Sequence, residues 1–382
     1  MRHGKIAEPS RPFSLVISVD PVRIHFTSIL TDSTFLPVFG RIGRVPFRVL
    51  RHDSVPRSLF ALKLVLTCVA LAALVYVVEW ASILDAAREA RPLWALAALA
   101  LVPLNVSLEA FRWHRLVRKL APDVKFKTSM AAVLSGYPLG LLTPGRIGDY
   151  VGRALYLRDI SPGASATLTF AERIATLACC LVFGLVALPY FLLTHTNVDS
   201  VAWMTVLVLG ILFTGFLLVL LLHPKLARAL LETVLPFRRI RHVFAVLNRF
   251  SVRDATELFG LSAVRYLIFS TQFVLMVHAF QGDVSWLTAY TGVVLVFFAK
   301  SAIPSITLGD LGIRESAAVF FLGAFGVAEA AAFNASLGIF AANILLPAFV
   351  GLPLLPRLRL RSAAKRNPAK TESEVTQPVV LS

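Results

Sequence analysis

The sequence predicts an all-α polytopic membrane protein, and three observations lead to this fold class. Hydrophobic residues make up 57% of the 382 positions, and only 16% are charged. Soluble domains carry about a quarter charged residues, so this chain lacks the polar surface that water requires. A chain surrounded by lipid must form helices or a closed barrel. The apolar runs are long and do not alternate, which favours helices.

Six apolar runs each approach the ~20 residues that a bilayer core requires. They lie at about 58–78, 92–111, 165–190, 200–222, 260–281 and 332–355. Two further apolar regions, 129–160 and 286–325, are interrupted by Gly and Pro. We therefore expect about six spanning helices plus two re-entrant or broken hairpins, about eight apolar segments in all.

Two tails flank this transmembrane domain, which covers 56–356. Residues 1–55 are rich in Pro and Arg without a sustained period, and we interpret them as a basic, poorly ordered cytoplasmic tail. An over-long translation start is the alternative, so it stays open whether 1–55 belong to the mature protein. Residues 357–382 are basic and polar, and we interpret them as a second cytoplasmic tail.

The distribution of the net charge of +16 orients the helices. Residues 112–127 contain six basic residues and one acidic residue, and 223–254 contain seven and two. Residues 79–91 contain two basic and three acidic residues. The positive-inside rule places the first two segments in the cytoplasm and the third outside. We expect a multi-pass protein of the cell (inner) membrane with both termini in the cytoplasm.

The basic segments do not indicate nucleic-acid binding, because base-stacking aromatic residues are not interleaved with them in a folded module. Anionic lipid explains basic loops between membrane spans equally well. The expected partner is therefore lipid, and nucleic acid is not expected.

The two broken hairpins resemble each other in sequence. Gly145-Arg-Ile-Gly148-Asp149 in the first corresponds to Gly309-Asp-Leu-Gly312 in the second. Given the loop positions, the first hairpin enters and leaves from the cytoplasm and the second from outside.

Each half therefore consists of a helix, a broken hairpin and a helix, at about 92–190 and 260–355. Equivalent helices run in opposite directions, which is the pattern of an inverted repeat. Such repeats place discontinuous helices and a substrate site near the midplane of the bilayer.

Ionisable residues within apolar segments are candidates for substrate binding, because burying them is costly. The candidates for contacting a lipid headgroup are Arg146, Asp149, Arg153, Glu172, Arg173, Lys300, Arg314 and Glu315. Structural alternatives stay open for several of them. Arg146 and Arg153 also fit ordinary cytoplasmic loop charges, and the neighbouring Glu172 and Arg173 could simply satisfy each other.

Glu109 and Arg265 lie near the ends of expected helices. For these two residues we favour the interpretation that their side chains reach the headgroup region by snorkelling.

The candidate hinges are Gly and Pro residues that interrupt the hairpins: Pro144, Gly145, Gly148, Pro304, Gly309 and Gly312. Proline breaks helix continuity, and glycine permits tight turns. A broken helix exposes N–H groups that attract phosphate, and a nearby arginine adds bidentate contacts. The neighbouring carboxylates would hold these arginines when no ligand is present.

No catalytic residue, cofactor or metal site is expected. The chain has no GxxxxGK[ST] motif for ATP binding. Its cysteines, Cys68, Cys179 and Cys180, lie in apolar runs without the spacing of metal ligands.

Two segments, TPGRIGDYVGRALYL and IPSITLGDLGIRESAAVFFLGAFGV, carry a resemblance to a known family. They resemble the two signature regions of the lysylphosphatidylglycerol synthase transmembrane-region family, also called flippase-like. The resemblance covers about 58–356. The chain departs from the family at Asp149, where a glutamate is usual after the glycine.

The resemblance implies a membrane domain that moves phospholipid or a lipid-linked isoprenoid precursor between leaflets. One alternative is a membrane-embedded lipid-modifying enzyme with a polyprenyl-phosphate donor, although the expected outer loops are short. Another is a non-catalytic partner of a separate lipid-synthesis enzyme. No aminoacyltransferase domain follows the last apolar run, so we do not expect lipid aminoacylation. The expected partners are anionic or isoprenoid lipid, and either a second copy of the chain or a lipid-synthesis enzyme.

Overall fold

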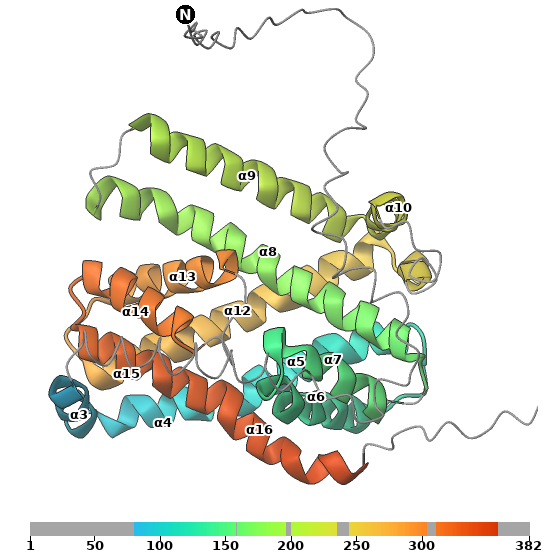
Figure 1. Cartoon of the computed structure of the whole chain (residues 1–382), viewed down its shortest axis with the longest axis horizontal. Helices are drawn as coiled ribbons and strands as arrows, with labels where there is room; N and C mark the ends of the chain where they lie inside the picture. Colours follow the sequence, from blue (N-terminus) through green and yellow to red (C-terminus); the bar gives the residue numbers. More distant parts are fainter. Residues whose placement is uncertain (1–79, 158, 196–199, 235–243, 304–310, 358–382) are drawn as a thin grey trace, which may run out of the picture. The chain divides into compact units, whose positions relative to one another are not determined.

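The structure is a computed structural model that describes residues 80–157, 159–195, 200–234, 244–303 and 311–357. All of them belong to one compact unit, Arg48–Ser382. Within the described residues, helices are the only regular secondary structure, which confirms the expected fold class (Figure 1). The tail 1–55, the expected span 58–78, the hinges Pro304 and Gly309, and the tail after residue 357 lie outside the described residues.

The first half begins with a short helix, α3, that precedes its repeat unit. Its helices are α3 (Trp80–Arg88), α4 (Pro92–Ala100), α5 (Val102–Arg118), α6 (Phe126–Leu141), α7 (Ile147–Tyr156) and α8 (Pro162–His195). Two helices connect the halves: α9 (Ser200–Leu222) and α10 (Pro224–Val234). The second half contains α12 (Val252–Phe280), α13 (Trp286–Ala302), α14 (Ile313–Ala324), α15 (Glu329–Phe340) and α16 (Leu346–Gly351).

Short helices of other types complete the described structure. They are the 3₁₀ helices Pro144–Arg146, Ala245–Arg249 and Leu352–Arg357, and the π-helix Ala341–Leu345. The π-helix joins α15 to α16 in one long helix.

In the part of the chain that the structure describes, five helices are long and apolar enough to cross a membrane. They are Pro92–Arg118, Pro162–His195, Val201–Leu222, Val252–Phe280 and Glu329–Pro356. They coincide with five of the six expected spans.

Two expected boundaries and one expected loop are wrong. The span expected at 92–111 continues to Arg118, because its charged side chains find partners on neighbouring helices. The span expected from residue 260 begins at Val252, because Ser251 and Asp254 form a capping box that starts the helix there. The segment 223–254, expected as a loop, contains α10 and a 3₁₀ helix.

The two broken hairpins exchange their packing partners between the halves (Figure 1). The first hairpin packs α6 on α16 of the second half, and α13 of the second hairpin packs on α8 of the first half. Both contacts are close. A Cβ atom on Gly351 would lie 2.1 Å from the carbonyl oxygen of Leu134, and one on Gly184 would lie 2.2 Å from the ring of Phe298. This reciprocal packing supports the repeat.

The first helices of the two halves run antiparallel. At one end, the backbone N–H of Arg91 donates to the carbonyl of Ala279 at 2.7 Å. At the other end, the Lys119 ammonium lies 2.7 Å from the Asp254 carboxylate. Residues later in α4 and α5 thus contact residues nearer the N-terminus of α12, so the two helices are antiparallel. Opposite directions of equivalent helices are what an inverted repeat predicts.

Candidate functional site

The turn of the first hairpin holds an arginine in a strained conformation. Gly145 has φ 59° and Arg146 has φ 55°, and Arg146 is the only residue besides glycine with positive φ in the described part of the chain. The hydroxyl of Thr143 accepts a hydrogen bond from the N–H of Gly148 at 2.6 Å, which closes the turn. A left-handed conformation costs a residue other than glycine ~1–2 kcal/mol, and such strain concentrates at functional sites.

Arg153, on the α7 helix that follows this turn, is the centre of a buried ion cluster. It is fully buried, and its guanidinium contacts carboxylates from three helices. Nε donates to Asp149 Oδ1 at 2.9 Å, Nη1 to Glu172 Oε2 at 2.6 Å, and Nη2 to Glu109 Oε1 at 2.5 Å. A buried charge is tolerated when it is paired in this way.

Each of the three carboxylates also has a further cationic partner. Arg265 Nη2 donates to Glu109 at 2.7 Å, and Arg112 Nη2 donates to Glu172 at 2.9 Å. Arg173 pairs with Asp149. The cluster therefore joins α5, α7 and α8 to α12.

The turn of the second hairpin has a matching construction. Gly312 has φ 87°, and its N–H donates to Glu315 Oε2 at 2.7 Å. The other carboxylate oxygen accepts from Arg314 Nη2 at 2.5 Å. Arg314 Nε also donates to Ser336 Oγ at 2.9 Å. The second hairpin thus places an arginine–carboxylate pair directly after its glycine turn.

A cavity of about 440 Å³ brings the two halves together. Its lining includes Arg146, Glu172, Arg173, Lys300 and Arg314 of the predicted site. Asp149, Arg153 and Glu315 do not line it, but each pairs with residues that do. Asp149 pairs with Arg173, Glu315 with Arg314, and Arg153 with Glu109 and Glu172. Gly145 also reaches the cavity. The sequence predicts direct contact between Arg153 and a headgroup, but in this conformation Arg153 does not reach the cavity.

The site carries an excess of positive charge. In the described chain, seven cationic groups line the cavity or pair with its carboxylates, against four acidic groups. The cations are Arg112, Arg146, Arg153, Arg173, Arg265, Lys300 and Arg314, and the acids are Glu109, Asp149, Glu172 and Glu315. Nε of Arg112, Arg146 and Arg265 is buried without a hydrogen-bond partner among the described residues. These donors, and the six arginines set against four carboxylates in the described chain, suit an anion.

The sequence-based interpretation of Glu109 and Arg265 is wrong. Both side chains turn toward the cavity and pair with each other, so they are not snorkelling anchors. Arg112 also lines the cavity, although its sequence position predicts a cytoplasmic loop. The i, i+3 spacing of Glu109 and Arg112 places them on one helix face, and this signal could have identified the pair.

A polar contact at the cavity wall joins the halves a second time. Asn105 Nδ2 donates to Asn343 Oδ1 at 2.6 Å, and both residues are buried. Asn343 lies within the π-helix, whose widened turn interrupts the regular hydrogen bonding of the last helix. Such π-helices are frequent at functional sites.

Comparison with known families agrees with this architecture. No curated protein and no solved structure matches the chain. Residues 60–351, well over half of the chain, match the family model of the lysylphosphatidylglycerol synthase TM region. The matched segment contains both hairpins and the cavity between them. The chain therefore belongs to the lysylphosphatidylglycerol synthase transmembrane-region family.

Proposed function

We propose that this protein moves an anionic lipid between the two leaflets, with the lipid headgroup bound in the arginine-lined cavity. The observation that carries the proposal is the buried Nε groups of Arg112, Arg146 and Arg265, which lack a hydrogen-bond partner among the described residues, in an arginine-lined cavity built from both halves. Either a phospholipid or a phosphate-linked isoprenoid supplies the required anionic headgroup. Membership of the family supports a role in lipid handling.

The lining of the cavity suits an amphipathic ligand. Its lining combines arginines with apolar side chains such as Phe269, Phe297 and Ile344. An anionic headgroup gains charge-assisted hydrogen bonds from arginine, while hydrocarbon chains remain in apolar surroundings. A phosphate group would also satisfy the buried guanidinium N–H groups that lack partners.

Alternating exposure is the mechanism that we infer from the repeat. The first hairpin carries Arg146, the second carries Arg314, and each hairpin packs on the other half. A relative movement of the halves would therefore open the cavity toward one leaflet and then the other. Arg153 and its carboxylates keep the cluster paired when the headgroup leaves. The inferred location is the cell (inner) membrane, with the Lys119 end of α5 in the cytoplasm.

Reconstituted vesicles test this function directly. Purified protein is placed in vesicles that contain a trace of fluorescent phosphatidylglycerol, phosphatidylcholine or a polyprenyl phosphate, and an impermeant quencher reports the outer leaflet. We expect the anionic probes to cross faster than in protein-free vesicles, and phosphatidylcholine to cross at the background rate. If every anionic probe crosses at the protein-free rate, the transport function is refuted, and a non-transporting partner of a lipid-synthesis enzyme becomes the better explanation.

A further inference from the structure

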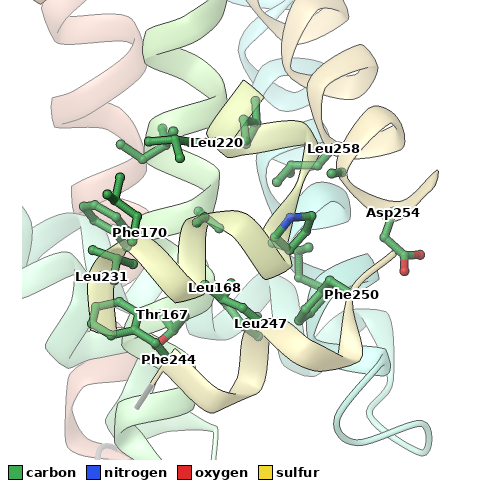
Figure 2. A pocket seen from close by; sticks show the side chains of 18 of the residues that line it. Thr167, Leu168, Phe170, Leu220, Leu231, Phe244, Leu247, Phe250, Asp254 and Leu258 are labelled. Atoms are coloured by element: carbon green, nitrogen blue, oxygen red, sulfur yellow. The ribbon is translucent and has the colours of Figure 1, made fainter. Parts of the chain in front are cut away.

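A second cavity, far more apolar than the first, lies beside α8, α9, α10 and α12. Figure 2 shows its lining side chains, and its volume is about 200 Å³. The lining residues are Leu116, Thr167, Leu168, Phe170, Ala171, Ile174, Leu217, Leu220, Leu221, Pro224, Ala227, Leu230, Leu231, Phe244, Leu247, Phe250, Asp254, Ala255 and Leu258. We call this space the α10 pocket.

Among the described residues, the α10 pocket offers no free polar group to a ligand. Only Thr167 and Asp254 in its lining have polar side chains. The hydroxyl of Thr167 donates to the carbonyl of Gly163 at 3.1 Å. The Asp254 carboxylate forms an ion pair with Lys119 and belongs to the capping box at the start of α12. Apolar cavities of ~150 Å³ stay free of water and take up hydrocarbons, so the chemistry of this pocket selects a hydrocarbon.

The pocket forms because α9 and α10 make an arm that only partly contacts the rest of the protein. The helix α9 is mostly exposed and apolar along its length. The helix α10 is amphipathic and turns Ala227, Leu230 and Leu231 toward the pocket. An amphipathic helix that directly follows a membrane span is typical of an element lying in the membrane interface. Lipid chains therefore have direct access to this space.

Three cationic residues are neighbours in sequence of residues that line the pocket. Lys225 follows the lining residue Pro224, and Arg253 precedes Asp254. In the sequence, Arg249 lies between the lining residues Leu247 and Phe250. All three side chains are exposed. Because Asp254 is already paired with Lys119, these cations are available to a negatively charged headgroup.

The geometry points to a resident anionic phospholipid that places one acyl chain in the α10 pocket and its headgroup near Lys225, Arg249 and Arg253. The acyl chain of this lipid fills the space between the arm (α9 and α10) and the helices α8 and α12. Of the residues that the structure describes, Ile174 alone lines both this pocket and the arginine-lined cavity, so it forms part of the wall between them. The resident lipid is thus distinct from a transported one.

Photo-crosslinking in vesicles tests this site. The full chain is reconstituted with phosphatidylglycerol that carries a diazirine near the end of one acyl chain, and labelled peptides are mapped by mass spectrometry. We expect labels on peptides from α8 and α10. Ala227→Trp fills the pocket, and Ala229→Trp places the same bulk on the exposed side of α10 as a matched control. Labelling should fall about tenfold in Ala227→Trp, corresponding to ~1.4 kcal/mol of lost binding, and stay at the wild-type level in Ala229→Trp.

Each outcome decides a part of the inference, independently of any transport measurement. Equal labelling of these peptides in wild type, Ala227→Trp and Ala229→Trp would overturn the pocket as a chain site. A phosphatidylcholine probe with the same diazirine should label these peptides less than the phosphatidylglycerol probe does. Equal labelling by the two probes would overturn the anionic headgroup assignment.

Discussion

At the scale of single residues, two arginines of the first hairpin have different tasks. Arg153 is fully buried, contacts three carboxylates and does not line the cavity. Arg146 lines the cavity, is held at φ 55°, and stacks its guanidinium 5.3 Å from the ring centre of Tyr137. We therefore assign Arg153 to the stability of the cluster and Arg146 to ligand binding.

Replacing Arg146 should remove ligand binding without unfolding the protein. In Arg146→Gly, glycine relieves the left-handed strain, and the added freedom of the unfolded chain offsets that gain, so we expect the free energy of unfolding to change by less than ~1 kcal/mol. The transport rate of an anionic lipid should fall at least ~10-fold, the size of a lost charge-assisted contact. Arg146→Lys should restore only part of the rate, because lysine lacks the planar fork of arginine. Wild-type transport by Arg146→Gly would exclude Arg146 from the site.

Replacing Arg153 should instead destabilise the fold. Arg153→Ala removes one partner from each of three buried carboxylates, and losing one member of a buried ion pair costs ~3–5 kcal/mol. We expect a value near ~3 kcal/mol, because Glu109, Asp149 and Glu172 each keep another arginine. Chemical unfolding in detergent measures the loss, with the exposed Arg249→Ala as control. Equal stability of the two variants would contradict the buried cluster.

At the scale of elements, the first hairpin depends on backbone contact between α6 and α7. A Cβ atom on Gly152 would lie 2.7 Å from the Cα of Gly136 and 2.8 Å from the carbonyl oxygen of Ser135. This approach places Asp149 and Arg153 against the rest of the cluster. Small residues that allow close helix packing are typical of membrane helices.

Gly152→Ala should therefore separate the two helices of the hairpin. Overpacking of this kind costs ~1–3 kcal/mol, because backbone atoms must move. Gly215→Ala is the matched control, since a Cβ atom at Gly215 in α9 meets no atom within 4 Å. Thermal unfolding in detergent should show a lower midpoint for Gly152→Ala and an unchanged one for Gly215→Ala. A shift of similar size in both would show that the close approach has no special effect.

At the scale of the whole molecule, the antiparallel pairing of α4 and α5 with α12 relates the two halves. Polar contacts follow this pairing, including Arg115 with Glu257 at 2.6 Å and Arg112 with Ser262 at 2.5 Å. A pairing that joins equivalent helices in opposite directions is the basis of the proposed alternating exposure.

The topology follows from the same pairing and can be measured. Arg253 and Asp283 are exposed at opposite ends of α12. In a variant without native cysteines, Arg253→Cys should react with an impermeant thiol reagent from the cytoplasmic side and Asp283→Cys from the outer side. Inside-out and right-side-out vesicles give the two readings. Reaction of both positions from one side would contradict a membrane-spanning α12 and with it the inverted repeat.

Much of this architecture could be predicted from the sequence, and the limits are physical. Apolar runs long enough to span a membrane identified the helices, and the segments around Gly145 and Gly312 identified the turns. The inward orientation of Glu109 and Arg112 was harder to predict. Charged residues beside a basic segment are typical of a loop, and only their partners show that they belong to a buried helix face. Those partners, Glu172, Arg153 and Arg265, are remote in sequence, and only folding brings them together.

The amide pair in the cavity wall has a consequence for biosynthesis. Among the described residues, Asn105 lies in the first helix long enough to span the bilayer, and its partner Asn343 emerges from the ribosome only with the last one. Until then, this buried amide lacks the hydrogen bond that hydrocarbon cannot supply. We expect a nascent fragment that stops before Glu329 to be degraded faster than the full chain in a pulse-chase experiment, and Asn105→Leu to slow that degradation. The last spanning helix of the described chain thus satisfies a polar group in the first one described.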